Sequence, residues 1–173
     1  YEGDGEKINI TLKNENETLK TITTKVPEKD SLQIWYPTIK ADSLQLILTK
    51  SDYTKEYIYK LKEQKKDSLS FSAKPLGTLN FRQNFELNSS TPITKFDKSK
   101  MALINKDSIA VEFTTDYDEF NQKLTFNWLK EPEQKYNITL LPGALTDFFE
   151  QTNDTLQYKL STKSSTDYGN LTL

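Results

Sequence analysis

The sequence predicts an all-β protein made of two tandem antiparallel β-sandwiches, with at most one short helix near residues 144–150. Three observations support this. Apolar and polar residues alternate in many short segments, the breaks between segments are rich in Pro, Asn, Asp, Ser and Lys, and helical spacing of apolar residues is almost absent. Because successive strand residues point to opposite faces, this alternation is typical of sheets with one buried and one solvated face.

The alternating segments follow one another along the chain. Each places its apolar side chains on one face, where a large side chain contributes about 1.5–3 kcal/mol on full burial. In chain order the apolar sets are Leu32/Ile34/Tyr36, Leu44/Leu46/Leu48, Tyr57/Tyr59/Leu61, Leu69/Phe71/Ala73, Ile109/Val111/Phe113, Leu124/Phe126/Trp128, Tyr136/Ile138/Leu140 and Leu156/Tyr158/Leu160. The charged segment 62–67 is expected to be a hairpin tip, and 144–150, after a Pro-Gly break, a short helix.

A domain boundary is expected between Asn84 and Pro92, where a polar stretch ends in proline. Residues before a proline disfavour helix, and such stretches are typical of links between domains. A single continuous sandwich is the competing interpretation, and the first unit would lack a strand if the chain begins inside it. The expected division is a first β-sandwich over 1–84, a second over 91–164, and a linker with the first strand of a following domain over 165–173.

Composition excludes several kinds of chemistry. The 173 residues include no cysteine and no histidine, and 23 Lys and Arg against 25 Asp and Glu give a net charge of −2. Disulfides, thiolate or imidazole metal ligands, and Cys or Ser-His nucleophiles are therefore excluded. The near-neutral balance lacks the concentrated basic face of a nucleic-acid-binding protein. No run approaches the ~20 apolar residues of a membrane helix, so we expect no membrane insertion by this segment.

We also expect no enzymatic activity and no cofactor. With only five glycines, the chain has no Gly-rich phosphate loop. No Asp/Glu pair stands in a recognisable glycosidase context, although two carboxylates can hydrolyse glycosides. Two small sandwiches also leave little room for a deep cleft.

A tripeptide of Asp, Ser or Thr, and a branched aliphatic residue opens a predicted strand five times. Turn chemistry is the first explanation, because an Asp side chain accepts hydrogen bonds from backbone N–H groups just ahead of it. The tripeptide also resembles the acceptor motif for O-glycosylation of exported proteins in Bacteroidota. That resemblance implies glycans on Ser31, Ser43, Ser68, Ser108 and Thr155.

One acidic segment is a candidate metal site. Asp116, Asp118 and Glu119 are expected to share a loop, and hard cations such as Ca²⁺ bind several oxygen ligands. The segment lacks the glycine and the regular ligand spacing of a calcium loop, so a solvated turn is the alternative.

Aromatic residues form a second candidate site, a platform on which sugar rings could stack. It would comprise Trp35, Tyr36, Tyr53, Tyr57 and Tyr59. Core packing is the alternative for Tyr36, Tyr57 and Tyr59, which fall on apolar faces. Trp35 falls on the polar face of its strand, so we expect it either to contact a ligand or to lie beneath a neighbouring domain.

The most specific segment is 136–149, with the sequence YNITLLPGALTDFF, followed by 153–156 and by Thr162-Lys163. It resembles the end of a bacterial Ig-like domain of S-layer proteins and of large Bacteroidota envelope lipoproteins, and the match covers about 91–173. We expect Pro142-Gly143 to break a strand, Asp147 to end the following turn, and the two phenylalanines after it to plug the end of the sandwich.

The resemblance implies a non-catalytic structural or interaction module of an exported multidomain cell-envelope lipoprotein, at the outer membrane or cell surface. Its partners would be other protein domains or envelope proteins, with glycans as a further candidate. The anchor would lie outside this segment, which opens at Tyr1 and is expected to be part of a longer protein. The alternatives are a carbohydrate-binding or adhesion module and an accessory subunit of an outer-membrane assembly or secretion complex.

Overall fold

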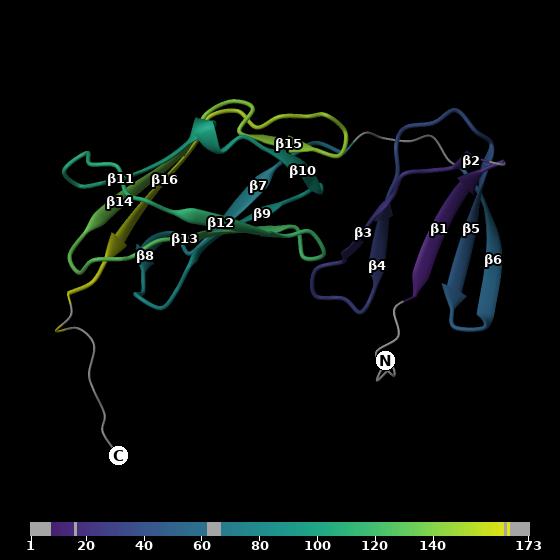
Figure 1. The fold of residues 1–173 in the computed structure, drawn as a ribbon, viewed down its shortest axis with the longest axis horizontal. Coiled ribbons are helices and arrows are strands. Elements are labelled where there is room, and N and C mark those ends of the chain that lie inside the picture. The colour runs from purple at the N-terminus through teal and green to yellow at the C-terminus, as the bar shows by residue number, and fades with distance from the viewer. Residues whose placement is uncertain (1–7, 16, 62–66, 165, 167–173) are drawn as a thin grey trace, which may run out of the picture.

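The computed structural model describes residues 8–15, 17–61, 67–164 and 166 (Figure 1). Within them the protein is nearly all β, with several antiparallel sheets, which confirms the predicted fold class. A short 3₁₀ turn, η1 (Lys98–Lys100), is the only helical element of these residues, and none of their helices is long or apolar enough to span a bilayer. The strand expected within 165–173 and most of the expected hairpin tip at 62–67 lie outside the described residues.

The N-terminal unit consists of a four-stranded sheet and a two-stranded hairpin. Its strands are β1 (Asn9–Asn14), β2 (Glu17–Thr18), β3 (Ile22–Lys25), β4 (Leu32–Trp35), β5 (Ser43–Lys50) and β6 (Tyr53–Lys60). The antiparallel sheet has the order β2-β1-β5-β6, and β3 pairs with β4. Figure 1 places the β3–β4 hairpin between this sheet and the rest of the protein.

Leu12, Leu44 and Leu46 form the centre of a small core on one face of the four-stranded sheet. Leu12 pairs with Leu46 across the β1–β5 ladder, so their side chains share a face. Ile34 and Tyr36 pack against this cluster from the hairpin side. The predicted alternation in β5 is therefore confirmed, and the hairpin covers the apolar face that it creates.

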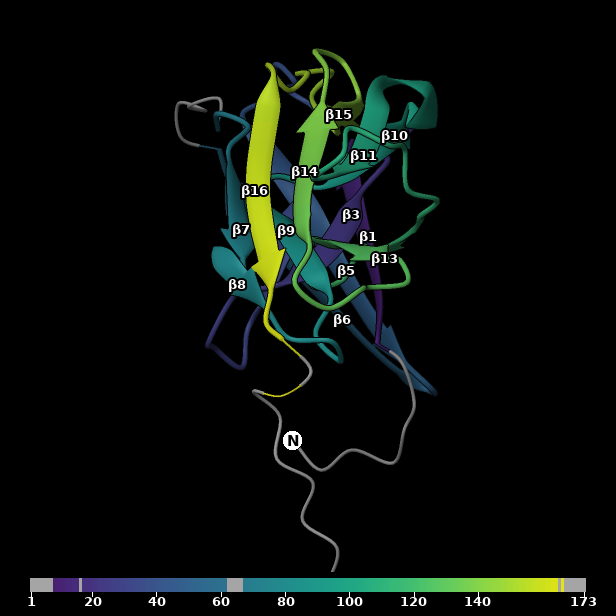
Figure 2. The same ribbon diagram turned by 90° about the vertical axis from the view of Figure 1, so that its left-hand side faces the viewer.

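The C-terminal unit is a β-sandwich. Its strands are β7 (Phe71–Lys74), β8 (Gly77–Leu79), β9 (Phe85–Ser89), β10 (Ile93–Phe96), β11 (Met101–Asn105), β12 (Thr114–Asp118), β13 (Lys123–Asn127), β14 (Lys135–Leu140), β15 (Leu145–Asp147) and β16 (Leu156–Thr162). One layer has the order β12-β13-β9-β7 and the other β11-β14-β16-β8 (Figure 2), while β10 pairs with β15. The β8–β16 pair is parallel.

The two layers enclose the main hydrophobic core. Phe85, Phe126 and Ile138 are completely buried there, and the ring centroids of Phe85 and Phe126 lie 5.7 Å apart in an edge-to-face arrangement. The alternation predicted for 124–128 and for 136–140 is confirmed, because the apolar side chains of both segments line this core.

The strand pairing places the division between the units elsewhere than the sequence predicted. The expected boundary at 84–92 overlaps β9, which pairs with β13, and β8 lies before it yet pairs with β16. The C-terminal sandwich therefore begins near residue 67. The polar stretch was misleading because it is internal: Ser89 and Thr91 are buried, and the Ser89 N–H donates to the carbonyl of Gln122.

Residues 144–150 do not form the expected helix. Leu145–Asp147 is strand β15, paired with β10. The chain then turns because the Asp147 carboxylate accepts hydrogen bonds from the backbone N–H groups of Phe149 and Gln151. A side chain that satisfies backbone donors in this way stabilises a turn and removes the need for helical hydrogen bonds.

The set Ile109/Val111/Phe113 is not a strand element either, and β12 begins only at Thr114. Asn105 Oδ1 accepts hydrogen bonds from the backbone N–H groups of Asp107 and Ile109, which closes a tight turn directly after β11. Ile109 is left 60% exposed. Alternation alone did not indicate this turn.

Candidate interaction surfaces

Trp35 lies at the joint between the two units. The strand pairing β3–β4 sets it opposite Ile22, and its indole Nε1 donates to Thr24 Oγ1 over 2.8 Å. The Trp35 ring meets Phe149 of the C-terminal sandwich edge to face, with centroids 6.1 Å apart, and the residue is only 5% exposed. Of the two expectations for Trp35, the exposed ligand contact is wrong. It lies beneath the neighbouring unit, since the hairpin is covered on both faces.

One backbone hydrogen bond also ties the units together, and a second set of contacts fixes the first residues of the C-terminal sandwich. The backbone N–H of Lys25 donates to the carbonyl of Phe120, a loop residue between β12 and β13, over 2.8 Å. Where the chain enters the sandwich, Gln151 binds it twice: its Oε1 accepts from the Leu69 N–H and its Nε2 donates to the Asp67 carbonyl. Hydrogen bonds and ring packing therefore both act at this joint.

Asp147 positions the loop that supplies Phe149. Its carboxylate is completely buried, with Oδ1 2.9 Å from the N–H of Phe149 and 2.7 Å from that of Gln151. Oδ2 accepts from the hydroxyl of Thr91 at 2.8 Å. Asp147 does form a turn, but not the expected one: it is the last residue of β15, and its carboxylate opens the turn that follows this strand instead of ending the turn after Pro142-Gly143. The expected plug is not seen: neither Phe148 nor Phe149 belongs to the hydrophobic core of the sandwich, and Phe149 packs against Trp35 of the other unit.

The pairing of Trp35 with Phe149 was not predicted from the sequence. Both residues carried a signal: Trp35 stood out as a large aromatic on a polar face, and Phe149 belonged to an unusual Phe-Phe pair after a turn. What the sequence does not encode locally is that the two segments, more than a hundred residues apart, meet.

The five Asp-Ser/Thr-aliphatic tripeptides are not held by the expected turn chemistry. Among the described residues, none of their five carboxylates accepts a hydrogen bond; Asn105, for example, holds the turn that contains Ser108. The aliphatic residue is buried in one case, Leu44, and largely exposed in another, Ile109. The hydroxyl-bearing residues are all exposed: Ser31, Ser43, Ser68, Ser108 and Thr155.

The acidic segment does not assemble a metal site. No group of three or more acidic side chains converges anywhere in the described ranges, so Asp116, Asp118 and Glu119 are not brought together. Asp116 and Asp118 lie on β12 and not in the expected loop. Tyr117 between them packs against the core, so the two carboxylates point to the opposite face of the strand. Hydrogen bonds from the Asn121 side chain and backbone hold the pKa of Asp118 below its usual value.

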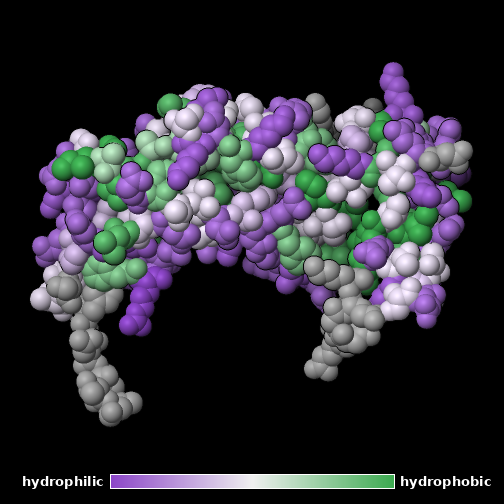
Figure 3. All heavy atoms as spheres, in the orientation of Figure 1, coloured by the Kyte–Doolittle hydropathy of each residue, from purple (hydrophilic) through white to green (hydrophobic). Residues whose placement is uncertain are grey.

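Three tyrosines form a row along one face of β6. The rings of Tyr57 and Tyr59 lie 6.3 Å apart, and Lys55 Nζ is 5.1 Å from the Tyr57 ring centroid. Tyr53 and Tyr59 are exposed, while Tyr57 packs partly against the small core. Trp35, which is buried at the joint, is therefore not part of the aromatic platform expected from the sequence. Figure 3 shows hydrophobic atoms at the surface of this N-terminal unit, at the right of the view.

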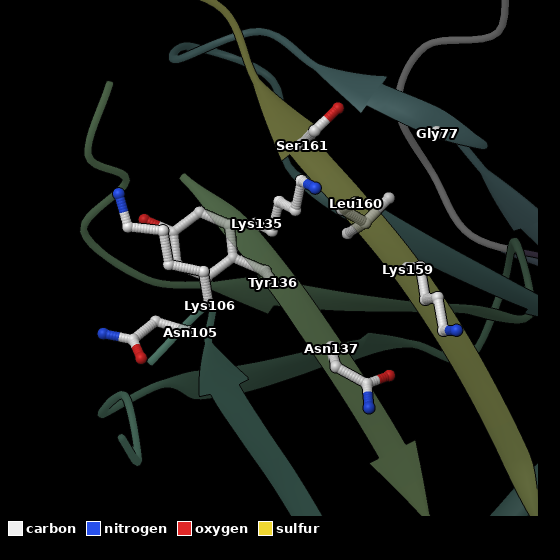
Figure 4. Close-up of a pocket in the computed structure, with 9 residues that line it drawn as sticks. All are labelled: Gly77, Asn105, Lys106, Lys135, Tyr136, Asn137, Lys159, Leu160 and Ser161. Carbon is white, nitrogen blue, oxygen red and sulfur yellow. The ribbon is translucent and has the colours of Figure 1, made fainter. Parts of the chain in front are cut away.

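A shallow hollow of about 290 Å³ lies on the outer face of the β11-β14-β16-β8 layer (Figure 4). Lys106, Lys135 and Lys159 border it, and none of its lining residues is acidic. Asn137, which lies opposite Lys159 in the β14–β16 ladder, has a buried Oδ1 without a hydrogen-bond partner in the described structure. The hollow thus offers cationic groups on a polar sheet face, but no pair of carboxylates for acid–base chemistry.

Comparison with known proteins does not assign a family: no protein-family model matches the chain, and no curated protein is significantly similar to it.

Proposed function

We propose that this chain is a non-catalytic structural and interaction module of an exported multidomain cell-envelope lipoprotein, which spaces or docks other domains. The observation that carries the proposal is the joint between the units, where Trp35 packs on Phe149 and Lys25 hydrogen-bonds to Phe120. A spacer must hold its domains at a set separation and angle. Packed aromatic rings together with backbone hydrogen bonds resist bending more than a flexible linker does.

The envelope part of the proposal rests on the resemblance of 136–149 to bacterial Ig-like domains. Its support is local. Gly143 adopts a left-handed φ of 75° at the predicted break between β14 and β15, and the Asp147 carboxylate holds the turn after β15. The proposed partners are other domains of the same protein or other envelope proteins, and the proposed anchor lies outside this segment.

Replacing Phe149 with alanine is expected to release the joint without unfolding either unit. Trp35 keeps its hydrogen bond to Thr24, but its ring loses the aromatic contact across the joint. In the wild-type protein, residual dipolar couplings of both units should fit one common alignment tensor. In Phe149→Ala the two units should fit different tensors, and Trp35 fluorescence should shift to longer wavelength.

Phe96→Ala is the matched control, since it removes a partly exposed phenyl ring of the same sandwich whose aromatic partner is Tyr117 and not Trp35. It should leave the common tensor intact. Two results would refute a fixed spacer: separate tensors already in the wild-type protein, or a common tensor that survives Phe149→Ala.

We also propose that the five exposed Asp-Ser/Thr-aliphatic hydroxyls carry O-linked glycans. The support is their resemblance to the acceptor motif, together with their exposure. Protein purified from its native host should have an intact mass above that of the polypeptide. A variant with alanine at Ser31, Ser43, Ser68, Ser108 and Thr155 should lose the excess. An unshifted mass of the native protein would end this proposal.

A further inference from the structure

β6 is an edge strand that faces away from the rest of the protein. It closes the sheet order β2-β1-β5-β6, and among the described residues only β5 pairs with it. Figure 1 shows β6 at the end of the molecule opposite the C-terminal sandwich. A strand of eight residues with one free edge can pair with another strand.

The free edge is formed by the backbone groups of alternate residues. The Leu61 N–H donates to the Asp42 carbonyl over 2.9 Å, which extends the β5–β6 ladder by one hydrogen-bonded pair. Hydrogen-bonded and non-hydrogen-bonded positions alternate in an antiparallel ladder. The odd-numbered residues of β6 therefore bond to β5. The outward N–H and C=O groups are those of Thr54, Glu56, Ile58 and Lys60.

The side chains at this edge are arranged symmetrically around Ile58. Ile58 is 78% exposed on the outer face of the sheet, and Glu56 and Lys60 lie on the same face two residues before and after it. On the other face, Tyr57 and Tyr59 flank it. A negative and a positive charge at equal distances from an apolar centre make the strand complementary to an antiparallel copy of itself.

We propose that β6 pairs antiparallel with β6 of a second copy of this chain, about a two-fold axis through Ile58. Ile58 then meets Ile58 of the partner subunit, and Glu56 meets Lys60 of the partner subunit on each side of the axis. All of these are positions with outward backbone groups, so each pair exchanges two backbone hydrogen bonds. Tyr57 meets Tyr59 of the partner subunit on the opposite face.

Charge favours the register with its axis at Ile58 over registers with the axis at a nearby residue. An axis at Glu56 would set that carboxylate against its own copy, and an axis at Lys60 would do the same for two ammonium groups; like charges directly opposite each other are destabilising. An axis at Tyr57 would place Glu56 against Ile58 of the partner subunit. Charged residues on an edge normally discourage strand pairing, and here they favour the axis at Ile58 over those at Glu56 and Lys60.

This pairing stands apart from the proposed spacer function, because it uses the end of the molecule opposite the joint. It joins two four-stranded sheets into one continuous antiparallel sheet. Two spacers joined in this way would form an elongated dimer with a C-terminal sandwich at each end.

Sedimentation equilibrium of the purified chain tests the proposal. The wild-type protein should be a monomer–dimer mixture that shifts to dimer with concentration. Glu56→Lys should raise the dissociation constant about tenfold or more, because two attractive cross-strand pairs become repulsive. Combining Glu56→Lys with Lys60→Glu restores opposite charges in the same register and should recover the dimer.

Asp52→Lys is the matched control, since it makes the same change in charge at an exposed turn residue next to β6 but outside these pairs. It should leave the dissociation constant within about twofold of wild type, as expected for charges beyond the cross-strand contacts. A wild-type protein that stays monomeric at all concentrations overturns the proposal. The proposal is also overturned if Glu56→Lys leaves the dissociation constant unchanged, or if adding Lys60→Glu to this variant fails to restore the dimer.

Discussion

Replacing Phe126 with alanine is expected to lower the free energy of unfolding of the C-terminal sandwich by about 3–5 kcal/mol, the range for removing a buried aromatic ring. Phe126 is completely buried between the two layers. Its ring contacts Phe85 edge to face and stacks on Phe113 at 5.8 Å between centroids. Both layers would lose packing, and the interior is too tightly built to close the cavity fully.

Urea unfolding monitored by circular dichroism measures this loss. Phe120→Ala is the matched control, because it also removes a phenyl ring, but one from a residue that is 46% exposed. Phe120 accepts the hydrogen bond from Lys25 at the joint through its backbone carbonyl, which the substitution keeps. It should cost about 1 kcal/mol or less, as surface substitutions usually do. Equal losses in the two variants would mean that the core does not lie where the structure places it.

Local alternation was enough to predict most of the strands. The sets at 44–48, 124–128 and 136–140 face the cores as predicted, because one buried face imposes a period of two whatever the partner strand is. Alternation says nothing about which strands pair. The pattern therefore did not indicate that β8 pairs with β16, and the prediction assigned residues 67–84 to the wrong unit.

The candidate sites were harder to predict because they depend on contacts between distant segments. Trp35 was placed on a solvent-facing side because β4 was assumed to have one buried face, whereas its hairpin lies between two packed layers. A turn role for Asp147 was predicted, since Asp side chains commonly accept backbone hydrogen bonds in turns, but the strand β15 before it was not, because a helix was expected there. The sequence does contain a signal for the exposed Ile58, because this apolar residue shares its strand face with the charged Glu56 and Lys60.

Asp147→Ala is expected to destabilise the C-terminal sandwich by about 3 kcal/mol or more. The change leaves the backbone N–H groups of Phe149 and Gln151 and the hydroxyl of Thr91 without their acceptor. A hydrogen bond to a charged group contributes about 1.5–3 kcal/mol, and a buried donor left unpaired adds its desolvation cost. Urea unfolding measures the loss. Asp116→Ala, the same substitution at an exposed residue of β12, should change stability by about 0.5 kcal/mol at most.

Asp147→Asn separates the acceptor role of this side chain from its shape. The amide oxygen can still accept from Phe149 and Gln151, and the amide nitrogen can donate to Thr91, whose hydroxyl is able to accept. Its cost should therefore be clearly smaller than that of Asp147→Ala. Because the Asp147 turn positions Phe149 against Trp35, Asp147→Ala should also red-shift Trp35 fluorescence under conditions where the sandwich remains folded. An unchanged emission would show that the turn and the joint are independent, and that the ring of Phe149 is held by contacts other than this carboxylate.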